Sequence, residues 1–334
     1  MILITGGAGY IGTHLVLGLL RDGHSIIVYD DLSNSTIANL KKLADAKIHK
    51  QRFMFTRGDI RDRSKLERLF IQNKITRVIH LAGLKSINES ILNKELYYDV
   101  NVNGSRNVFE LAFKYNVYTI IFSSTAAIYR PTNSGEYTEL SITDGTSSPY
   151  SQNKIDAENI LHALKARDIT IDVVVLRYFN PVGTDKTIPL LEENINSNNL
   201  FPNILQNIQD NTYFLIHGDD YDTPDGTAIR DYIHISDLVA AHRLMLEEYV
   251  LFTTVRIFNV GSGTGYSVRE VVEAFNRNYI HPVLFRYTNR RAGDVAISIA
   301  NTTKIRDTFD WKPSRDLSDM VKSVLDTTDV NKRK

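Results

Sequence analysis

The chain has 334 residues, 43% of them hydrophobic, and is long enough to bury a large core. Lys and Arg total 39, as do Asp and Glu, and this zero formal charge argues against nucleic acid or an anionic membrane surface as a partner. The absence of cysteine excludes disulfides, thiolate zinc sites and cysteine catalysis. A strand-like run begins at residue 2, which leaves no room for a signal peptide, and no apolar stretch approaches the roughly 18 residues of a membrane span, so we expect a cytoplasmic protein.

The first half of the chain alternates short apolar runs with longer helical patterns. We expect strands at residues 2–5, 25–30, 53–59, 77–82, 118–124 and 172–179, and helices at about 10–22, 91–115 and 151–168. Most of the strands are nearly continuous apolar runs, which is typical of parallel strands covered on both faces. The alternation predicts an α/β fold of Rossmann type, with a doubly wound parallel sheet and right-handed crossovers.

The rhythm of strands and helices changes after about residue 180, where loop-rich sequence begins. We expect a Rossmann domain over residues 1–180, whose sheet can also receive later segments. A smaller α/β region over residues 181–334 would form the C-terminal domain, with a ligand cleft between the two.

A glycine cluster connects the first strand to the first helix in "ILITGGAGYIGTHLVLGLL". Gly6, Gly9 and Gly12 fit the pattern G-x-x-G-x-x-G, and Gly7, Gly9 and Gly12 also fit G-x-G-x-x-G. Glycines at these positions allow a tight turn and let the backbone approach a pyrophosphate at the helix N-terminus. A plain glycine-rich turn is the alternative, but the strand–loop–helix context favours a dinucleotide site.

Asp30 ends the second expected strand, 18 residues after Gly12. A carboxylate there can bind both ribose hydroxyls of NAD and would repel the 2′-phosphate of NADP, so we expect NAD as the cofactor. Polar or small residues also follow later strands, at Asp59-Ile60, at residues 82–85 and at residues 123–125. Because the carboxyl ends of parallel strands meet at one edge, a common ligand is expected there.

Tyr150 and Lys154 lie four residues apart in "SSPYSQNKIDAE" and would share one face of a helix that begins near Tyr150. They could be an ordinary exposed helical pair. They could also be a base and its activating cation, because an ammonium and the positive charge of an oxidised nicotinamide both favour the phenolate of a tyrosine whose free pKa is about 10. Thr125, at the end of a neighbouring strand, can hydrogen-bond the same reacting oxygen.

Motifs along nearly the whole chain carry a family resemblance. They include "TGGAGYIG", "YDDLSNS", "GDIRD", "HLAGLKSINES", "FSSTAAIY", "SPYSQNK", "LRYFNPVG", "DGTAIRDYIHISD" and "RRAGD". By these motifs the chain resembles the extended short-chain dehydrogenase/reductase superfamily and, within it, the UDP-glucose 4-epimerases.

The resemblance implies an enzyme that inverts C4 of UDP-hexoses, so that UDP-glucose and UDP-galactose interconvert. Tightly held NAD would take hydride from C4 while Tyr150 removes the O4 proton, and hydride would return to the opposite face of the 4-keto sugar. Lys154 would bind the nicotinamide ribose and tune the tyrosine, and Thr125 would hold O4. A homodimer is also implied, through the two long helices expected at about 91–115 and 151–168.

The resemblance also assigns binding residues. NAD would be bound by Gly6, Gly9, Tyr10, Ile11, Gly12, Asp30, Asp31, Leu32, Ser33, Asn34, Ser35, Asp59, Ile60, Leu81, Ala82, Gly83, Lys85, Asn101, Tyr150, Lys154 and Phe179. The UDP-sugar would be bound by Lys85, Thr125, Tyr150, Asn180, Asn199, Leu200, Leu215, His217, Arg230, Tyr232, Arg291, Asp294 and Ser298. Arg230 and Arg291 would supply cations for the diphosphate, although each could instead form a surface ion pair.

The segment "RDYIHISD" places three potential metal ligands three residues apart, at Asp231, His234 and Asp237. We predict no metal, because the family uses this segment structurally and the epimerase reaction needs none.

Several positions depart from the family pattern. Thr125 stands where many members have serine, Val100 replaces a common asparagine, and His217 stands where an aromatic residue usually faces the uracil. The loop after Tyr129 lacks its usual glycine. Ser298 stands where members restricted to plain hexoses often carry a bulky tyrosine, so we hypothesise that UDP-N-acetylglucosamine and UDP-N-acetylgalactosamine are also substrates.

Other functions within the superfamily stay open. A 4,6-dehydratase would carry an Asp-Glu pair after Thr125, where this chain has Ala126 and Ala127. A decarboxylase is less directly excluded. A non-catalytic NAD-binding regulator is the alternative of another class, but such proteins usually discard the tyrosine or the lysine, and this chain has both.

Overall fold

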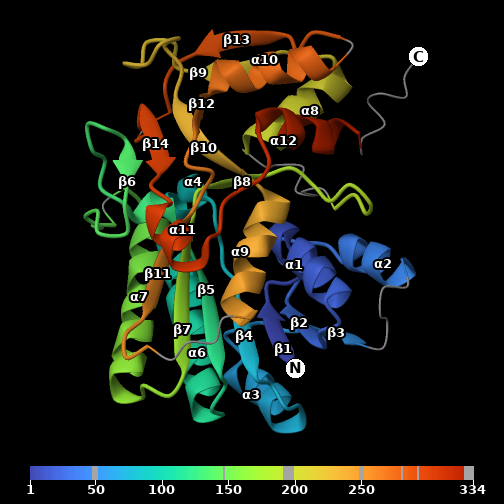
Figure 1. The fold of residues 1–334 in the computed structure, drawn as a ribbon, viewed down its shortest axis with the longest axis vertical. Helices are drawn as coiled ribbons and strands as arrows, with labels where there is room; N and C mark the ends of the chain where they lie inside the picture. The colour runs from blue at the N-terminus through green and yellow to red at the C-terminus, as the bar shows by residue number, and fades with distance from the viewer. Residues whose placement is uncertain are drawn as a thin grey trace. The chain divides into compact units, whose positions relative to one another are not determined.

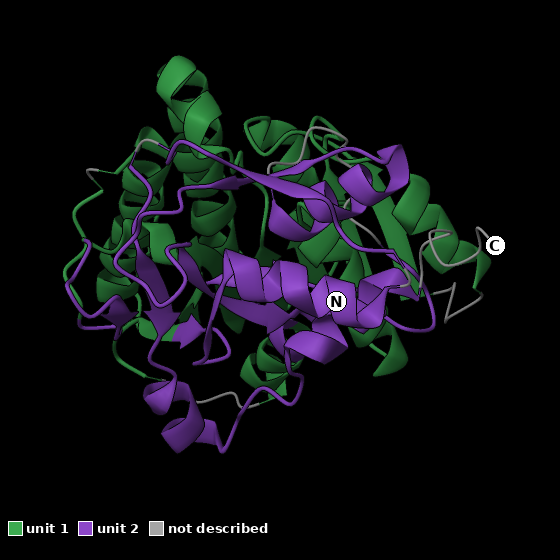
Figure 2. Cartoon of the chain, turned by 90° about the horizontal axis from the view of Figure 1, so that it is seen from above, with its two compact units in different colours: residues 1–130, 141–178, 239–258 green, residues 131–140, 179–238, 259–334 purple. Residues whose placement is uncertain are grey.

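The computed structural model describes residues 1–46, 52–145, 147–190, 199–247, 252–279, 281–291 and 293–326. The chain divides into two compact units, each assembled from separate segments (Figure 2). Unit 1 comprises residues 1–130, 141–178 and 239–258, and unit 2 comprises residues 131–140, 179–238 and 259–334. A domain boundary at residue 180 stays a prediction.

A seven-stranded sheet with strand order β11-β7-β5-β4-β1-β2-β3 organises unit 1 (Figure 1). The strands in chain order are β1 Ile2–Thr5, β2 Ile26–Asp30, β3 Phe53–Arg57, β4 Arg77–His80, β5 Thr119–Thr125, β7 Asp172–Tyr178 and β11 Arg256–Val260. Each of the pairs β1–β2, β1–β4, β2–β3, β4–β5 and β5–β7 is parallel. The predicted Rossmann-type α/β fold is confirmed.

Helices connect the strands of this sheet, as parallel pairing requires. They are α1 Tyr10–Arg21, α2 Ala38–Asp45, α3 Arg63–Gln72, α4 Ile87–Leu92, α5 Lys94–Tyr98, α6 Ser105–Lys114, α7 Pro149–Arg167 and α9 Ile235–Glu247, with a short 3₁₀ turn, η3, at Ala126–Ile128. Every residue of β1, β2 and β7 is buried, which explains why the sequence shows continuous apolar runs there.

The single helix expected over residues 91–115 is a chain of shorter pieces. α4 ends at Leu92, α5 follows at Lys94, and a π-helical stretch, η2, spans Asp99–Gly104 before α6. Hydrogen bonds made by Asn101 to the loop after β4 fix the π-helical turn in place. A helical hydrophobic pattern does not distinguish a short π-helical turn from the α-helix around it.

Unit 2 contains two smaller sheets and its own core. β6 Glu136–Tyr137, β8 Asn180–Val182, β10 Ile229–His234, β12 Gly265–Ser267 and β14 Ile297–Ala300 form one sheet, and β9 Phe214–His217 pairs with β13 Phe285–Thr288 in the other. The helices are α8 Leu200–Asp210, α10 Val268–Asn278, α11 Thr303–Phe309 and α12 Leu317–Leu325. Apolar faces of α8, α10 and α12 enclose the core, which includes Phe201, Val271, Phe275 and Met320.

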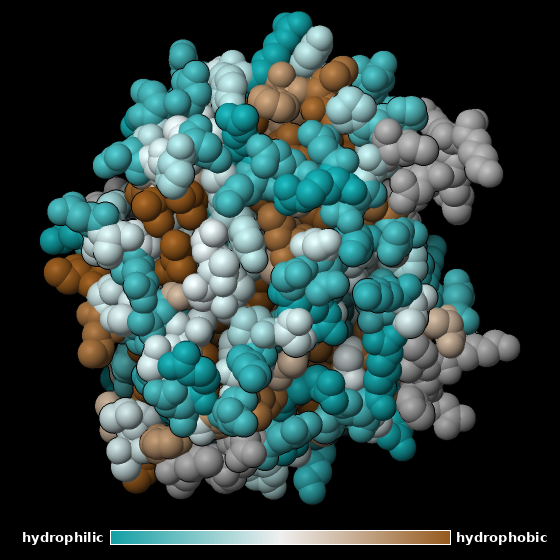
Figure 3. Space-filling view, turned by 45° about the horizontal axis from the view of Figure 1, so that its top comes forward, coloured by the Kyte–Doolittle hydropathy of each residue, from teal (hydrophilic) through white to brown (hydrophobic). Residues whose placement is uncertain are grey.

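The surface is mainly hydrophilic on the face shown in Figure 3, with hydrophobic side chains in separate groups between polar ones. Several large apolar side chains of α4 and α5 are exposed, among them Ile91, Leu92 and Leu96. No helix in the described part of the chain has both the length and the apolar composition needed to cross a membrane.

Candidate active site

The glycine turn after β1 is closed so tightly that it excludes side chains. Gly6 has a φ of +70°, and a Cβ there would lie 2.6 Å from the backbone nitrogen of Ala82. A Cβ on Gly12 would lie 2.5 Å from the carbonyl oxygen of Gly6. Gly9 differs, because among the described residues its Cβ would meet only that oxygen, at 3.4 Å. Gly9 is also the N-cap of α1 and has no side chain with which to cap it, so the turn fits an approaching pyrophosphate.

Asp30 lies beside this turn and is almost fully buried. Its carboxylate accepts hydrogen bonds from the backbone nitrogens of Ala8 and Leu32, both at 2.9 Å, and from the Ser35 hydroxyl at 3.0 Å. Burial raises the pKa of Asp30, and the two backbone bonds oppose that shift. These three bonds leave acceptor capacity on the carboxylate, which fits the two hydroxyls of the NAD ribose.

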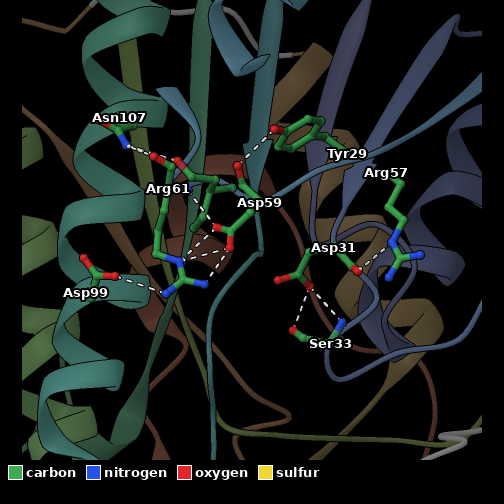
Figure 4. A network of polar contacts seen from close by, with 9 residues as sticks. Tyr29, Asp31, Ser33, Arg57, Asp59, Arg61, Asp99 and Asn107 are labelled. Atoms are coloured by element: carbon green, nitrogen blue, oxygen red, sulfur yellow. Dashed lines mark hydrogen bonds and ion pairs between the residues drawn. The ribbon is translucent and has the colours of Figure 1, made fainter. Parts of the chain in front are cut away.

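Asp31 begins the loop after β2, which carries four other predicted NAD-binding residues. Its carboxylate accepts bonds from the Ser33 backbone at 2.8 Å and from the Ser33 hydroxyl at 2.7 Å (Figure 4). Leu32 has a φ of +63°, so this turn bends sharply. The remaining members of the loop are Asn34, which is exposed, and Ser35, which bonds Asp30.

Asp59 is held by an arginine that the sequence did not point to. Arg61 donates to both oxygens of Asp59, at 3.1 and 3.0 Å from its Nε, and also to Asp99 at 3.1 Å (Figure 4). The Arg61 hydrogen bond lowers the pKa of Asp59. Asn107 donates to the carbonyl oxygen of Ile60 at 3.1 Å, which ties this loop to α6. The motif "GDIRD" contains Arg61, and a charge partner two residues from Asp59 was the signal that could have found it.

Asn101 fixes the loop after β4, which holds the predicted residues 81–85. Its side chain accepts from the Leu84 nitrogen at 2.8 Å and donates to the Leu84 oxygen at 2.9 Å. The backbone oxygen of Asn101 accepts from Ser105 at 2.6 Å, and the Ser105 hydroxyl lies 2.8 Å from Nε2 of His80. Lys85 is exposed at the end of the loop.

His80 is fully buried at the end of β4 and lies at the centre of this polar chain. Its Nδ1 lies 2.6 Å from the Thr5 hydroxyl, and its ring stacks on Phe122. Burial and, to a smaller extent, the Lys154 ammonium lower the pKa of His80 to about 3. A neutral histidine therefore joins β1, β4 and the π-helical turn.

Tyr150 and Lys154 lie one turn apart near the start of α7, at the place that the helix-start signals predict. Ser148 caps the helix by accepting from the Ser151 nitrogen at 3.1 Å, and Pro149 occupies the first turn. The Tyr150 hydroxyl is hydrogen-bonded to Thr125 at the end of β5. The Lys154 ammonium donates to the carbonyl oxygen of Ser123 at 2.9 Å and lies 6.0 Å from the Tyr150 ring centroid. The structure thus brings the three predicted catalytic residues together.

Burial dominates the ionisation of this pair in the protein alone. It raises the pKa of Tyr150 to about 12, against the lowering effect of the Thr125 hydrogen bond. It lowers the pKa of Lys154 to about 8, against the raising effect of the Glu158 carboxylate. The lysine was expected to favour the phenolate, but in the protein alone the pKa of Tyr150 is set by burial, which the Thr125 hydrogen bond opposes only in part.

Two further groups near the pair were missed by the sequence reasoning. Tyr178 pairs with Thr125 in the β5–β7 register, and its hydroxyl lies 2.6 Å from Nε2 of the buried His242. Glu158 follows Lys154 by one turn of α7 and binds Arg177 of β7. The (i, i+4) spacing of a carboxylate after the lysine was a signal for Glu158, whereas nothing in the sequence links residue 178 to residue 242.

Unit 2 brings two of the predicted diphosphate-site residues together. The Arg230 guanidinium binds the Asp294 carboxylate and also donates to the backbone oxygens of Ile229 and Val295, each at 2.7 Å. The Arg291 side chain is exposed, and its carbonyl oxygen accepts from the Asp294 nitrogen at 3.2 Å. Ser298 of β14 pairs with Arg230 of β10 in parallel register, so it lies next to this ion pair.

The other predicted substrate residues occupy separate elements of unit 2. Asn180 of β8 pairs with Tyr232 of β10, and its amide donates to the Asp231 oxygen at 2.8 Å. Tyr232 is buried and packs on Phe201. Asn199 and Leu200 start α8, Leu215 and His217 lie on β9, and Phe179 is buried just before β8. His217 Nδ1 lies 3.2 Å from the Asn289 oxygen.

The three potential metal ligands of "RDYIHISD" have other partners. The Asp231 carboxylate accepts from the backbone nitrogens of Ser262, Gly263 and Ala300 at 2.6, 2.9 and 3.1 Å. Asp237 binds Arg315 at 2.5 Å. Within the described ranges, no three acidic or histidine side chains form a group that could hold a metal ion.

Residues 2–261 match the NAD dependent epimerase/dehydratase family. The chain belongs to this family. A relative named UDP-glucose 4-epimerase, from Neisseria meningitidis serogroup B, is 39% identical to this member over 96% of the chain and 94% of the relative.

Solved structures of epimerases are similar to this family member over nearly its full length. The UDP-glucose 4-epimerase of Bifidobacterium longum, in complex with NAD⁺ and UDP, has a TM-score of 0.91 at 36% identity and covers 97% of each chain. The UDP-Glc/GlcNAc 4-epimerase of Campylobacter jejuni has a TM-score of 0.82 at 32% identity, covering 100% of this chain and 99% of its own. The predicted resemblance is therefore confirmed at the level of the family.

Proposed function

We propose that this protein is an NAD-dependent UDP-glucose 4-epimerase. The observation that carries the proposal is the hydrogen-bonded pair of Thr125 and Tyr150, with Lys154 one turn further along α7. Its occurrence in a chain 39% identical to a UDP-glucose 4-epimerase over almost the whole length supports this activity over others in the family.

The cofactor would be held by the glycine turn, by Asp30 and by the loops that Asp59 and Asn101 fix. When bound, NAD⁺ supplies a hydride acceptor for C4 of the sugar and a positive charge. Tyr150 takes the proton from O4 of the hexose and later returns it. Thr125 holds that hydroxyl and the phenol in one hydrogen-bonded arrangement, and Lys154 contributes a cation that opposes the effect of burial on the tyrosine.

The UDP part of the substrate is assigned to unit 2, because Arg230 and Arg291 are cations suited to a diphosphate. In the structure Arg230 binds the Asp294 carboxylate. A diphosphate would either displace this carboxylate or bind Arg230 beside it. Asn180, Asn199, Leu200, Leu215, His217, Tyr232 and Phe179 are proposed to complete the binding of substrate and cofactor.

Three finer features belong to the proposal. Ser298 leaves the space for a 2-acetamido group, and the likeness to an epimerase named for both UDP-Glc and UDP-GlcNAc supports this sugar range. A homodimer would form through residues 91–115 and 151–168, and exposed apolar side chains of α4 and α5, where the first of these segments begins, support it. We also propose a cytoplasmic location, which the absence of cysteine supports.

The direct test is the conversion of UDP-galactose, with products identified by NMR and no nucleotide added. The wild-type protein should form UDP-glucose, whereas Tyr150→Phe should lower kcat by roughly 10²- to 10⁴-fold because the proton acceptor is gone. Tyr115→Phe, which changes a phenol on the surface near Glu67, is the matched control and should keep full activity.

Other products would replace the proposal. A pentose product from UDP-glucuronic acid, incubated in parallel because UDP-galactose has no carboxyl group to lose, indicates a decarboxylase. A 4-keto-6-deoxy sugar indicates a dehydratase, although Ala126 and Ala127 offer no acid or base for that elimination. Absence of turnover, with no 340 nm signal when UDP-sugar is added, would favour a non-catalytic NAD-binding regulator.

A further inference from the structure

Three consecutive residues at the end of β5 each bind a different residue of α7. The Ser123 carbonyl oxygen accepts from Lys154 at 2.9 Å, and the Thr125 hydroxyl is bonded to Tyr150. Between them, the Ser124 hydroxyl donates to the Glu158 carboxylate at 2.5 Å. The catalytic lysine and tyrosine are thus flanked by a third contact that touches neither of them.

The Glu158 carboxylate is buried, and both of its oxygens are used. Arg177 of β7 donates to Oε1 at 3.1 Å and to Oε2 at 2.7 Å, so the carboxylate bridges β5 and β7. Arg177 in turn donates to the Tyr129 hydroxyl at 3.0 Å and lies over the Tyr129 ring. Both charged side chains are only 5% exposed, so a rigid and fully bonded ion pair lies against one face of α7.

We propose that Glu158 is a positioning residue for Tyr150 and Lys154, because its bond to Ser124 fixes the end of β5 against α7 at the residue between their two partners. This inference rests on the proposed function for the role of the two catalytic side chains. The contacts of Ser123 and Thr125 depend on the backbone of Ser124, and Glu158 and Arg177 prevent that backbone from shifting along the helix.

Glu158 also has an electrostatic effect on Lys154. The groups that face the lysine are Glu158 and Tyr150 on α7, His80 on β4 and the Phe122 ring on β5. Since His80 and Tyr150 are neutral near pH 7, Glu158 is the negative group of this set. Its carboxylate raises the pKa of Lys154, in opposition to burial. Removing the charge must therefore move the lysine further toward its neutral form.

The test measures the titration of Lys154 directly, so it does not depend on turnover. Protein labelled with ¹³C at lysine Cε is titrated by NMR, and the Lys154 signal is assigned by its loss in Lys154→Arg. Glu158→Gln should lower the pKa of Lys154 by roughly one unit, the smaller end of the usual effect of a neighbouring opposite charge. In the turnover assay, the pH at which kcat falls on the alkaline side should decrease by the same amount. KM should not change, because Glu158 is buried.

A second buried ion pair in unit 1 provides the matched control. Asp172 and Arg256 form an ion pair that is buried like the pair of Glu158 and Arg177. Asp172 is the first residue of β7, the strand that also contains Arg177. Asp172→Asn removes a paired carboxylate in the same way but should leave the titration of Lys154 unchanged. Should Glu158→Gln fail to fold, Glu158→Gln/Arg177→Gln removes both charges, leaves no unpaired ion, and should still lower the pKa of Lys154.

A Lys154 signal that titrates at the same pH in wild type and in the Glu158 variants would overturn the inference. An equal shift in Asp172→Asn would also overturn it, because the effect would then be a general consequence of losing a buried ion pair. Failure of the proposed function has a separate signature, which is absence of UDP-galactose conversion by the unaltered protein.

Discussion

Burial favours the uncharged form of each ionisable residue around Tyr150. It raises the pKa of Tyr150 and lowers the pKa values of Lys154 and His80, so that each group moves toward its uncharged form. Tyr150, the proposed base, is consequently protonated in the protein alone. Glu158 opposes burial by raising the pKa of Lys154, so its removal should shift the lysine toward the neutral form.

The buried His80 makes the free energy of unfolding depend on pH. Its folded pKa of about 3 lies below its unfolded value, so between about pH 6.5 and pH 3 the unfolded chain binds one more proton than the folded chain. Stability supplied by neutral His80 is therefore present above pH 6.5 and is lost as the pH falls, by up to about 1.4 kcal/mol per unit.

Urea unfolding at pH 7.5, 6.5 and 5 measures the contribution of His80 to the free energy of unfolding. The wild type should lose more free energy of unfolding between pH 6.5 and 5 than His80→Gln, whose amide can still bond Thr5 and Ser105. His162→Gln, on the exposed side of α7, should follow the wild type. Parallel curves for wild type and His80→Gln would contradict the assignment.

Ser298 is predicted to set the range of sugars. Ser298→Tyr should reduce kcat/KM for UDP-N-acetylgalactosamine by roughly tenfold or more relative to UDP-galactose, because the phenol fills space needed by the acetamido group. Ser298→Ala keeps that space and should preserve the ratio. The measurement is the pair of kcat/KM values for each variant, and an unchanged ratio in Ser298→Tyr would refute the idea.

At the scale of elements, the glycine turn and the π-helical turn shape the cofactor region in different ways. The glycine turn is visible in the sequence, because Gly6 and Gly12 have no room for a side chain. The π-helical turn is not, because it depends on bonds from Asn101 to Leu84, 17 residues earlier. Short-range patterns predict the first kind of feature, and only the fold reveals the second.

Gly9 and Gly12 of this turn should respond differently to the same added methyl group. Gly12→Ala places its Cβ 2.5 Å from backbone atoms of Gly6 and Gly7, so it should lower the free energy of unfolding by about 1–3 kcal/mol. Gly9 has a φ of −72°, and an added Cβ would lie 3.4 Å from the Gly6 oxygen, which is an ordinary contact. The nucleotide-free Gly9→Ala variant should therefore be as stable as the wild type.

The affinity for NAD is a second property to measure in Gly9→Ala. Gly9→Ala should still weaken NAD binding by roughly tenfold or more, because the methyl group lies where the pyrophosphate must approach. Thermal unfolding of nucleotide-free protein and titration with NAD measure the two effects. Wild-type affinity in Gly9→Ala would show that the pyrophosphate does not pass this glycine.

For the whole molecule, the strand–helix alternation was enough to predict the fold of unit 1, because buried parallel strands appear as continuous apolar runs. The grouping of Tyr150, Lys154 and Thr125 could also be predicted, since Tyr150 and Lys154 share a helix turn and Thr125 ends the neighbouring strand. The contacts of Arg177 and His242 could not, because their partners Glu158 and Tyr178 are distant in sequence. Sequence patterns likewise gave no sign that residues 131–140 leave one unit and join the other.

The proposed homodimer can be tested on the exposed side chains of α4 and α5. Leu92 is 82% exposed and Leu96 is 43% exposed, an unusual amount for apolar residues on adjoining helices. Leu92→Glu/Leu96→Glu should weaken the dimer by roughly tenfold or more in light scattering after size-exclusion chromatography. Ile71→Glu on α3, where the isoleucine is 65% exposed, is the control, and a double variant that stays dimeric would rule out this interface.

The interleaving of the two units has a consequence for how the protein can be made. Residues 239–258 complete a body that begins at residue 1, so a nascent chain cannot finish its first compact structure until most of it has left the ribosome. A fragment that stops at residue 180 would lack β11, which leaves β7 with a bare hydrogen-bonding edge. Separate expression of either half should therefore give aggregates, and splitting the gene at that point is a poor route to a working enzyme.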